Sequence, residues 1–199
     1  DDKEFNVAYL LGLYQINKNK FNSGEFPTVL VESLLSLTEI RAKIIESTED
    51  DINDLLGLSL RGGGFGIADQ SRGGYSASGK GSGERDIVVL NEYGQQACII
   101  EAMCLTSVVK KTINEHYSKL VYNYNTQGNP IDYIVTYAKV KNFGNFWKNY
   151  QKLFDDIQNL TNRYTDKANI QVGRTFTPVE GTGETRTIIH ILVNFGVKP

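Results

Sequence analysis

The stretch ERDIVVLNEYGQQACIIEAMCL, residues 84–105, carries the clearest signal of the fold. It contains a short β-branched run, 86–91, and a longer apolar run, 96–105, and the turn residues Glu92-Tyr93-Gly94 lie between them. Apolar runs of this length on either side of a glycine-containing turn are typical of a β-hairpin. The sequence therefore predicts two antiparallel strands that are joined near residues 92–95.

Helical and strand-like patterns surround this hairpin. Apolar residues at helical spacing, with start signals around residue 48, predict helices at 4–17, 28–45, from 47 onward, 108–124 and 145–162. Alternating or continuous β-branched runs predict further strands at 65–69, 131–139, 170–179 and 185–195. The order helix, three strands, helix, strand predicts an α/β fold in which helices flank a mixed sheet, with N-terminal helices before this core and a β-hairpin after it.

Length and composition favour one globular domain. The 199 residues can bury one sizeable core, which we divide into N-terminal helices (1–46), a core (47–140) and a helix with a terminal strand pair (141–199). The first residue is not Met, so we expect a part of a larger protein. No apolar run approaches the roughly 18 residues of a membrane span, and we expect a cytoplasmic protein without a membrane partner.

Two cysteines support the cytoplasmic expectation. Cys98 and Cys104 lie six residues apart in one predicted strand, so they share a face but are too distant for a disulfide. Buried free thiols are the expected state in a reducing compartment. The net charge of −2 offers no overall attraction for nucleic acid, so any such site must be local.

The glycine-rich segment GGYSASGKGSG, residues 73–83, has the outline of a phosphate-binding loop. A Walker loop, however, needs Ser or Thr after its lysine and a helix behind it. Here Gly81 follows Lys80 and a strand follows the segment. We therefore expect no nucleotide cofactor, and Lys80 remains as a candidate cation.

Glu101 is the most unusual residue of the hairpin, because it is a carboxylate within the apolar run Ile99 to Met103. Such a group is costly to bury unless a metal, a cation or hydrogen bonds compensate its charge. Asp86 lies at a comparable distance from the turn, so the two carboxylates can share a face and bind Mg²⁺ or Mn²⁺. The alternative is that Asp86 caps its strand and Glu101 pairs with Arg85 or a lysine.

The order of these residues resembles the PD-(D/E)xK nuclease superfamily. Glu49 on a helix, Asp86 at the start of a strand and Ile100-Glu101-Ala102 in the next strand, followed by a helix and a strand, carry the resemblance over about residues 48–139. It implies a restriction-endonuclease-like αβββαβ core. It also implies a metal-dependent nuclease, in which Asp86 and Glu101 bind Mg²⁺ or Mn²⁺ and Glu49 (or Glu46) orients the attacking water, with DNA as the expected substrate rather than RNA.

Met103 departs from the family, whose lysine normally stands two residues after the acid. A displaced cation is then needed for catalysis, and Lys80, Lys110, Lys111 and Lys119 are the candidates, with Lys80 placed in the catalytic set. These lysines and Arg85 are also the candidate nucleic-acid contacts. Without a substitute cation, the chain is an inactive nuclease-fold module that binds nucleic acid or a protein partner, and an oligomerisation domain is the third alternative.

A narrower resemblance is to nuclease-like domains of bacterial conflict-system proteins, including signal-transduction NTPases. It is carried by residues 69–87, by Ile100-Glu101-Ala102-Met103 and by the helix that contains Ile113, His116, Lys119 and Leu120. It implies an effector module of a bacterial defence protein with a fused or associated NTPase or sensor domain. We expect His116 and His190 to be hydrogen-bonded core residues, because neither has a Cys or His partner at zinc spacing.

Overall fold

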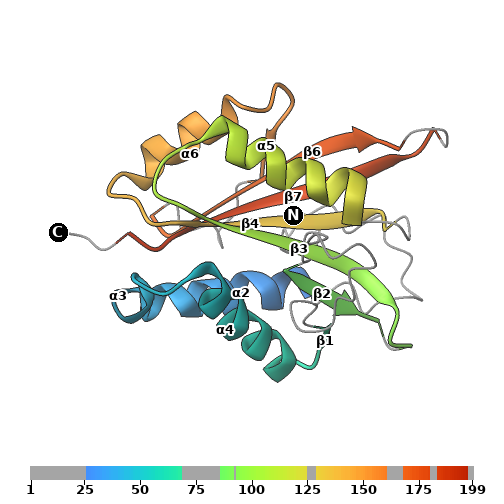
Figure 1. Cartoon of the computed structure of the whole chain (residues 1–199), viewed down its shortest axis with the longest axis horizontal. Coiled ribbons are helices and arrows are strands. Elements are labelled where there is room, and N and C mark those ends of the chain that lie inside the picture. The colour runs from blue at the N-terminus through green and yellow to red at the C-terminus, as the bar shows by residue number, and fades with distance from the viewer. Residues whose placement is uncertain are drawn as a thin grey trace, which may run out of the picture.

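A mixed sheet forms the centre of the molecule. The computed structural model describes residues 26–68, 86–91, 93–124, 129–160, 168–179 and 183–196. The helix predicted at 4–17, the glycine-rich segment with Lys80, and Arg85 lie outside these residues. Within the described part, seven strands follow the order β1-β2-β3-β4-β7-β6-β5 (Figure 1). Their bounds are β1 Gly66–Ala68, β2 Ile87–Leu90, β3 Gln96–Leu105, β4 Ile131–Ala138, β5 Gln158–Asn159, β6 Ile170–Pro178 and β7 Thr185–Asn194.

The predicted hairpin around residues 92–95 is confirmed. Strands β1, β2 and β3 form an antiparallel meander, and Ile87 lies opposite Ile100 in the pairing of β2 with β3. The turn is closed by Asn91, whose side-chain oxygen accepts hydrogen bonds from the amides of Tyr93 and Gln95. Strands β3, β4 and β7 are parallel to one another. Strand β6 is antiparallel to β7, and β5 is antiparallel to β6. The α/β class with a mixed sheet is thus confirmed.

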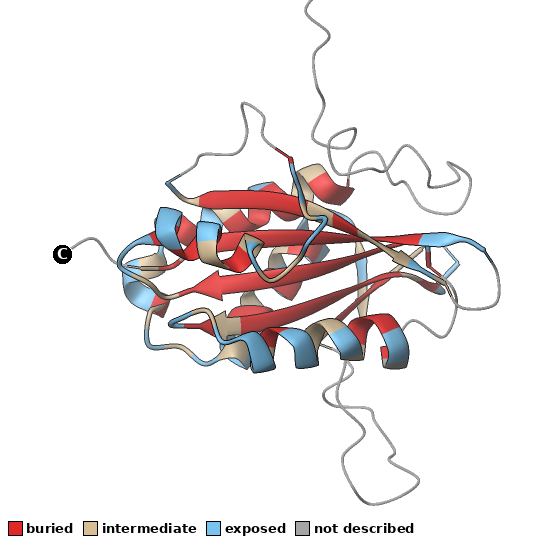
Figure 2. Cartoon of the chain, turned by 90° about the horizontal axis from the view of Figure 1, so that it is seen from above, coloured by how far each residue is buried: buried red, intermediate tan, exposed pale blue. Residues whose placement is uncertain are grey.

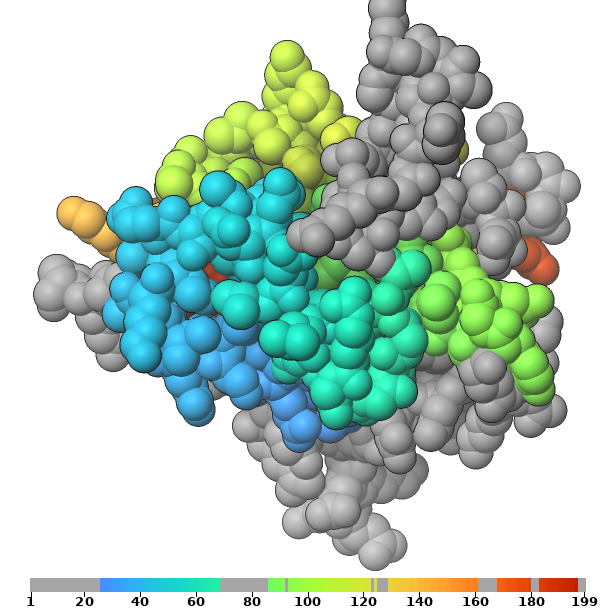
Figure 3. Space-filling model, turned by 60° about the horizontal axis from the view of Figure 1, so that its bottom comes forward, coloured from blue at the N-terminus to red at the C-terminus, as the bar shows by residue number. Residues whose placement is uncertain are grey.

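Helices cover both faces of the sheet, as Figure 1 shows. One face, which we call the α4 face, packs against α2 (Phe26–Glu39), α3 (Arg41–Ile44) and α4 (Glu49–Gly62), and Figure 3 shows these three helices side by side. The other, the α5 face, packs against α5 (Lys110–Ser118), the π-helical η2 (Lys119–Tyr124) and α6 (Phe143–Gln151). The order α4, β1, β2, β3, α5, β4 matches the predicted order of the core.

Alternation along each strand divides the core into two layers. In β3, Cys98, Ile100 and Ala102 belong to the cluster on the α4 face, whereas Ile99 and Met103 belong to the cluster on the α5 face. The central strands are buried almost along their whole length, while exposed residues gather on the outer sides of the helices (Figure 2). Glu101 lies two residues from both Ile99 and Met103 along β3, so its side chain points to the same face as theirs, the α5 face.

Helix α4 begins where the sequence predicts. Thr48 is its N-cap: the threonine hydroxyl accepts a hydrogen bond from the Asp51 amide, and the Asp51 carboxylate accepts one from the Thr48 amide. This reciprocal pair is a capping box, which satisfies two amides that the first helical turn leaves free. The cap places Glu49 as the first residue of α4, directed at the edge of β3.

Two helix predictions need correction. The helix predicted at 145–162 ends at Gln151, because Asp155 and Asp156 lie in a turn and the chain then pairs Gln158 with Arg174 in the short strand β5. Aspartate favours turns over helix interiors, which is consistent with the early end. The helix predicted at 108–124 is α-helical only to Ser118 and continues as η2.

The thiol prediction holds in part. Cys98 and Cys104 are free and lie toward the same face of β3, but Cys104 is only partly buried. Within the described residues, no helix combines the length and the apolar character that crossing a membrane requires.

Candidate metal centre

Two carboxylates accept hydrogen bonds from amides of β3 that lie beyond the end of its pairing with β2. The pairing of β2 with β3 stops at Ile87 and Ile100, so the next amides on that edge need other acceptors. Asp86 Oδ2 accepts a hydrogen bond from the Ala102 amide at 2.6 Å, and Glu49 Oε2 accepts one from the Cys104 amide at 2.6 Å. The residue before β2 and the first residue of α4 are therefore held against the same strand.

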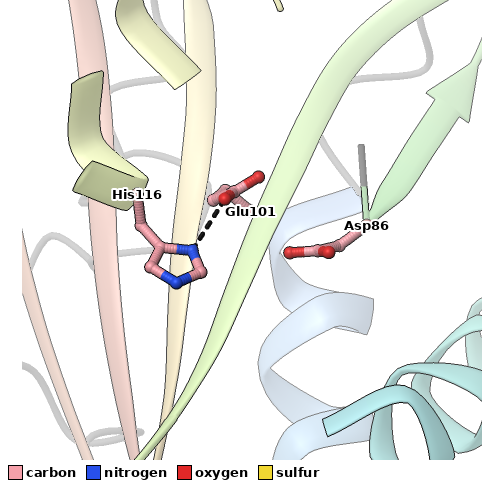
Figure 4. A group of neighbouring side chains, drawn as sticks. All are labelled: Asp86, Glu101 and His116. Carbon is pink, nitrogen blue, oxygen red and sulfur yellow. Dashed lines mark hydrogen bonds and ion pairs between the residues drawn. The ribbon is translucent and has the colours of Figure 1, made fainter. Parts of the chain in front are cut away.

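Glu101 reaches the same region from within β3. Its side chain is 2% exposed, and its Oε1 lies 2.7 Å from Nδ1 of His116 on α5. Its other oxygen, Oε2, is buried and has no hydrogen-bond partner among the described residues. Figure 4 shows the imidazole directed at the Glu101 carboxylate, while the Asp86 carboxylate reaches toward β3. A buried carboxylate oxygen without a partner is costly, so a positively charged ligand would stabilise it.

Three of these side chains lie within reach of a single ion. Asp86, Glu101 and His116 each offer one ligand atom, and these atoms all lie within 4.8 Å of one another. Two carboxylate oxygens and an imidazole nitrogen form a chemically ordinary donor set for a divalent cation. The residues present therefore fit a metal ion.

The electrostatics of the cluster favour a cation as well. Burial, followed by repulsion from Glu101, raises the pKa of Asp86 to about 7, despite its hydrogen bond with Ala102. Burial is also the main cause that raises the pKa of Glu49, to which repulsion from Glu101 adds. The hydrogen bond with Glu101 raises the pKa of His116, and the charge of Glu49 adds to this. Closely spaced carboxylates repel one another, and a divalent cation relieves that repulsion.

The structure brings together three of the four residues predicted to be catalytic. Glu49, Asp86 and Glu101 are all close enough to influence one another's charge. Glu49 rather than Glu46 occupies the helix-borne position, because Glu46 is exposed and Glu49 contacts β3. The fourth residue, Lys80, lies outside the described residues.

The described candidate lysines differ in exposure and in their electrostatic influence on this cluster. Lys110 and Lys111 are exposed at the start of α5, and Lys111 lies 3.9 Å from Glu115, one helical turn away, in an ion pair. Lys119 is partly buried, and its charge lowers the pKa of His116, against the effect of Glu101. Of these three residues, Lys119 is therefore the cation with an electrostatic influence on the site. Arg85, like Lys80, is outside the described residues.

Met103 contributes no charge to the site. It is 1% exposed and packs in the apolar cluster on the α5 face with Ile113 and Leu120. The position at which the resembled nuclease superfamily has its lysine is thus part of the core in this chain.

His116 is the residue of the site that sequence reasoning missed. Its expected hydrogen bond is present, but the partner is Glu101, which places His116 in the cluster rather than in an inert core. Its spacing of three residues from the buried Ile113 was the available signal, because residues three apart share a face of a helix. His190 agrees with the prediction: its two ring nitrogens lie 2.9 Å from the Tyr150 and Thr175 hydroxyls.

Comparison with known proteins adds no identification. Neither the family models, nor the curated proteins, nor the solved structures include a significant match to this chain. Its chemistry must be argued from the geometry of the site.

Proposed function

We propose that this chain is a divalent-metal-dependent nuclease that cleaves phosphodiester bonds, with DNA as the substrate. One observation carries the proposal: Asp86 and Glu101 converge at the edge of β3, and the buried Oε2 of Glu101 lacks a partner among the described residues. A cation bound by these carboxylates would activate water and offset the charge that develops on a phosphodiester during cleavage.

The arrangement of the core gives independent support. The elements α4, β1, β2, β3, α5 and β4 follow the αβββαβ order of restriction-endonuclease-like nucleases, with a meander followed by a parallel strand. The three acids stand on the elements that the resemblance to PD-(D/E)xK nucleases implies. A similar fold can host other chemistry, so the order of elements supports the proposal without carrying it.

Each side chain has a distinct role in this proposal. Asp86 and Glu101 hold the cation. Glu49 orients the attacking water and accepts its proton, for which a carboxylate with a raised pKa is better suited than one with an ordinary pKa. Its hydrogen bond to the Cys104 amide fixes the direction of its carboxylate. Lys80 or Lys119 supplies the positively charged side chain that stabilises the transition state, because Met103 is apolar.

One observation favours the alternative of a nuclease-fold module without catalysis. The expected lysine is replaced by Met103, which is fully incorporated in the core. Such a module would bind nucleic acid or a protein partner without cleaving it, and binding would persist in Glu101→Gln. The fused NTPase or sensor domain and the role in bacterial defence remain proposals from the resemblance alone.

A cleavage assay tests the proposal. Purified protein is incubated with plasmid, linear and single-stranded DNA and with RNA, in Mg²⁺, Mn²⁺ or EDTA. We expect DNA cleavage that requires the cation and falls at least about 100-fold in Asp86→Asn and in Glu101→Gln. Glu115→Gln is the matched control, because this exposed glutamate lies on α5 beside His116. Cleavage that persists in either site variant would overturn the assignment, and cleavage in no condition would favour the binding module.

A further inference from the structure

His116 gives the centre a donor that a magnesium site does not need. We propose that His116 is a third ligand of the ion and makes this centre selective for Mn²⁺ and Zn²⁺ over Mg²⁺. This inference rests on the metal centre of the proposed function, and it names the ion that the centre takes. It goes beyond the resemblance, which implies ligands only at Asp86 and Glu101.

The position of the imidazole is the first support. Nδ1 of His116 lies 2.7 Å from Glu101 Oε1, and one of its ring nitrogens belongs to the group of ligand atoms that lie within 4.8 Å of one another. The side chain is 18% exposed, so the protein covers most of its surface.

Helix α5 holds this imidazole in place from both sides. Three residues earlier, Ile113 is fully buried in the core of the α5 face. One residue later, the Tyr117 hydroxyl bonds with that of Thr177, and the Tyr117 ring stacks on His190 with 6.0 Å between ring centroids. A ligand held by packing and hydrogen bonds in this way loses little freedom when an ion binds.

The second, independent support is the oxygen that has no partner. Glu101 uses Oε1 for His116, whereas Oε2 is buried and lacks a hydrogen bond among the described residues. A hydrogen bond between the two side chains satisfies only one of the two carboxylate oxygens. An ion that takes an oxygen of Glu101 together with the imidazole would compensate the remaining oxygen as well.

The donor set determines the selectivity. Mg²⁺ prefers oxygen ligands in octahedral geometry and is usually held by one or two carboxylates. Imidazole nitrogen suits ions such as Zn²⁺, and the affinity of a given nitrogen and oxygen site for divalent first-row ions generally rises from Mn²⁺ to Cu²⁺ and is lower again for Zn²⁺. The centre should therefore bind Mn²⁺ at least about tenfold more tightly than Mg²⁺. In His116→Gln an amide oxygen replaces the nitrogen, so this preference should shrink.

Binding of Mn²⁺ to the ion-free protein tests the inference without a nucleic-acid substrate. Electron paramagnetic resonance gives the Mn²⁺ affinity, competition gives that of Mg²⁺, and electron spin echo modulation detects a ¹⁴N nucleus bound to Mn²⁺. The chain has only two histidines, and both nitrogens of the buried His190 are engaged by Tyr150 and Thr175. A ¹⁴N signal of imidazole therefore assigns His116.

We expect nitrogen modulation in the wild-type protein and in Glu115→Gln, and its loss in His116→Gln together with an affinity for Mn²⁺ that is about tenfold or more weaker. Bound Mn²⁺ without nitrogen modulation would overturn the inference and leave the carboxylate centre intact. The absence of Mn²⁺ binding would overturn both. Nitrogen modulation in a protein that cleaves no DNA or RNA would uphold the inference and refute the nuclease. The wild-type spectrum decides even if a variant fails to fold.

Discussion

Replacing Asp86 by asparagine should make the ion-free protein more stable than the wild type, and this advantage should grow as the pH rises. Burial and the neighbouring Glu101 raise the pKa of Asp86 from its usual 3.8 to about 7 in the folded protein. In the unfolded chain this carboxyl loses its proton near its usual pKa. Between these values the folded state binds the additional proton, so the wild type loses stability as the pH increases. The asparagine side chain cannot ionise, yet its amide oxygen can still accept the Ala102 hydrogen bond.

The size of this stability difference depends on how far the pH changes below the folded pKa of Asp86. One pKa unit corresponds to about 1.4 kcal/mol, and about two units separate pH 5 from the folded pKa of Asp86. The advantage of Asp86→Asn over the wild type should thus grow by about 2–3 kcal/mol between pH 5 and pH 8. For a chain of this length, that corresponds to a difference in unfolding midpoint that widens by roughly 5–10 °C.

Urea unfolding followed by circular dichroism in EDTA measures this difference. Each variant is compared with the wild type at the same pH, which cancels the titration of shared residues that lie away from the carboxylate cluster. Asp155→Asn, an exposed position in the turn after α6, is the control and should show a constant difference. A difference for Asp86→Asn that stays constant or narrows toward pH 8 would refute the account of the carboxylate cluster. Mn²⁺ at 100 times its dissociation constant should narrow the advantage of Asp86→Asn at pH 8, because it stabilises the wild type by about 2.7 kcal/mol.

Two further predictions concern stability and are measured by urea unfolding. Thr48→Ala removes the capping box of α4 and should lower the free energy of unfolding by about 1 kcal/mol; an unchanged value would contradict the role of this cap. His190→Leu leaves the hydroxyls of Tyr150 and Thr175 without their shared partner, so it should cost about 2–4 kcal/mol at pH 8. Burial lowers the pKa of His190 to about 3, so only the unfolded wild type takes up this proton between pH 6.5 and 3. The wild type then loses stability as the pH falls below 6.5, and the cost of His190→Leu should shrink; a cost that increases on acidification would refute this.

The hairpin and its two carboxylates could be predicted from sequence because their signals are local. The β-branched runs and the turn around Gly94 set the register of β2 against β3, and the register determines that Asp86 and Glu101 approach each other. The start of α4 was equally readable, since the capping box of Thr48 depends on residues only three apart.

The role of His116 could not be predicted, because it depends on how α5 sits over β3. A helical pattern identifies the buried side of α5 but does not determine which residue of β3 lies beneath it. The hydrogen bond from the Cys104 amide to Glu49 was equally inaccessible, since it depends on the described pairing of β2 with β3 ending at Ile87 and Ile100. Both features arise from contacts between elements far apart in the sequence.

A crystal structure of the protein grown with Mn²⁺, with diffraction data collected at the manganese absorption edge, would show directly whether the metal centre forms. We expect one strong anomalous peak between Asp86, Glu101 and His116, and no such peak in Glu101→Gln. Two results would contradict the metal centre on which the proposed function depends. One is no manganese peak at this site although manganese peaks appear at other sites of the same crystal. The other is a peak at this site that persists in Glu101→Gln.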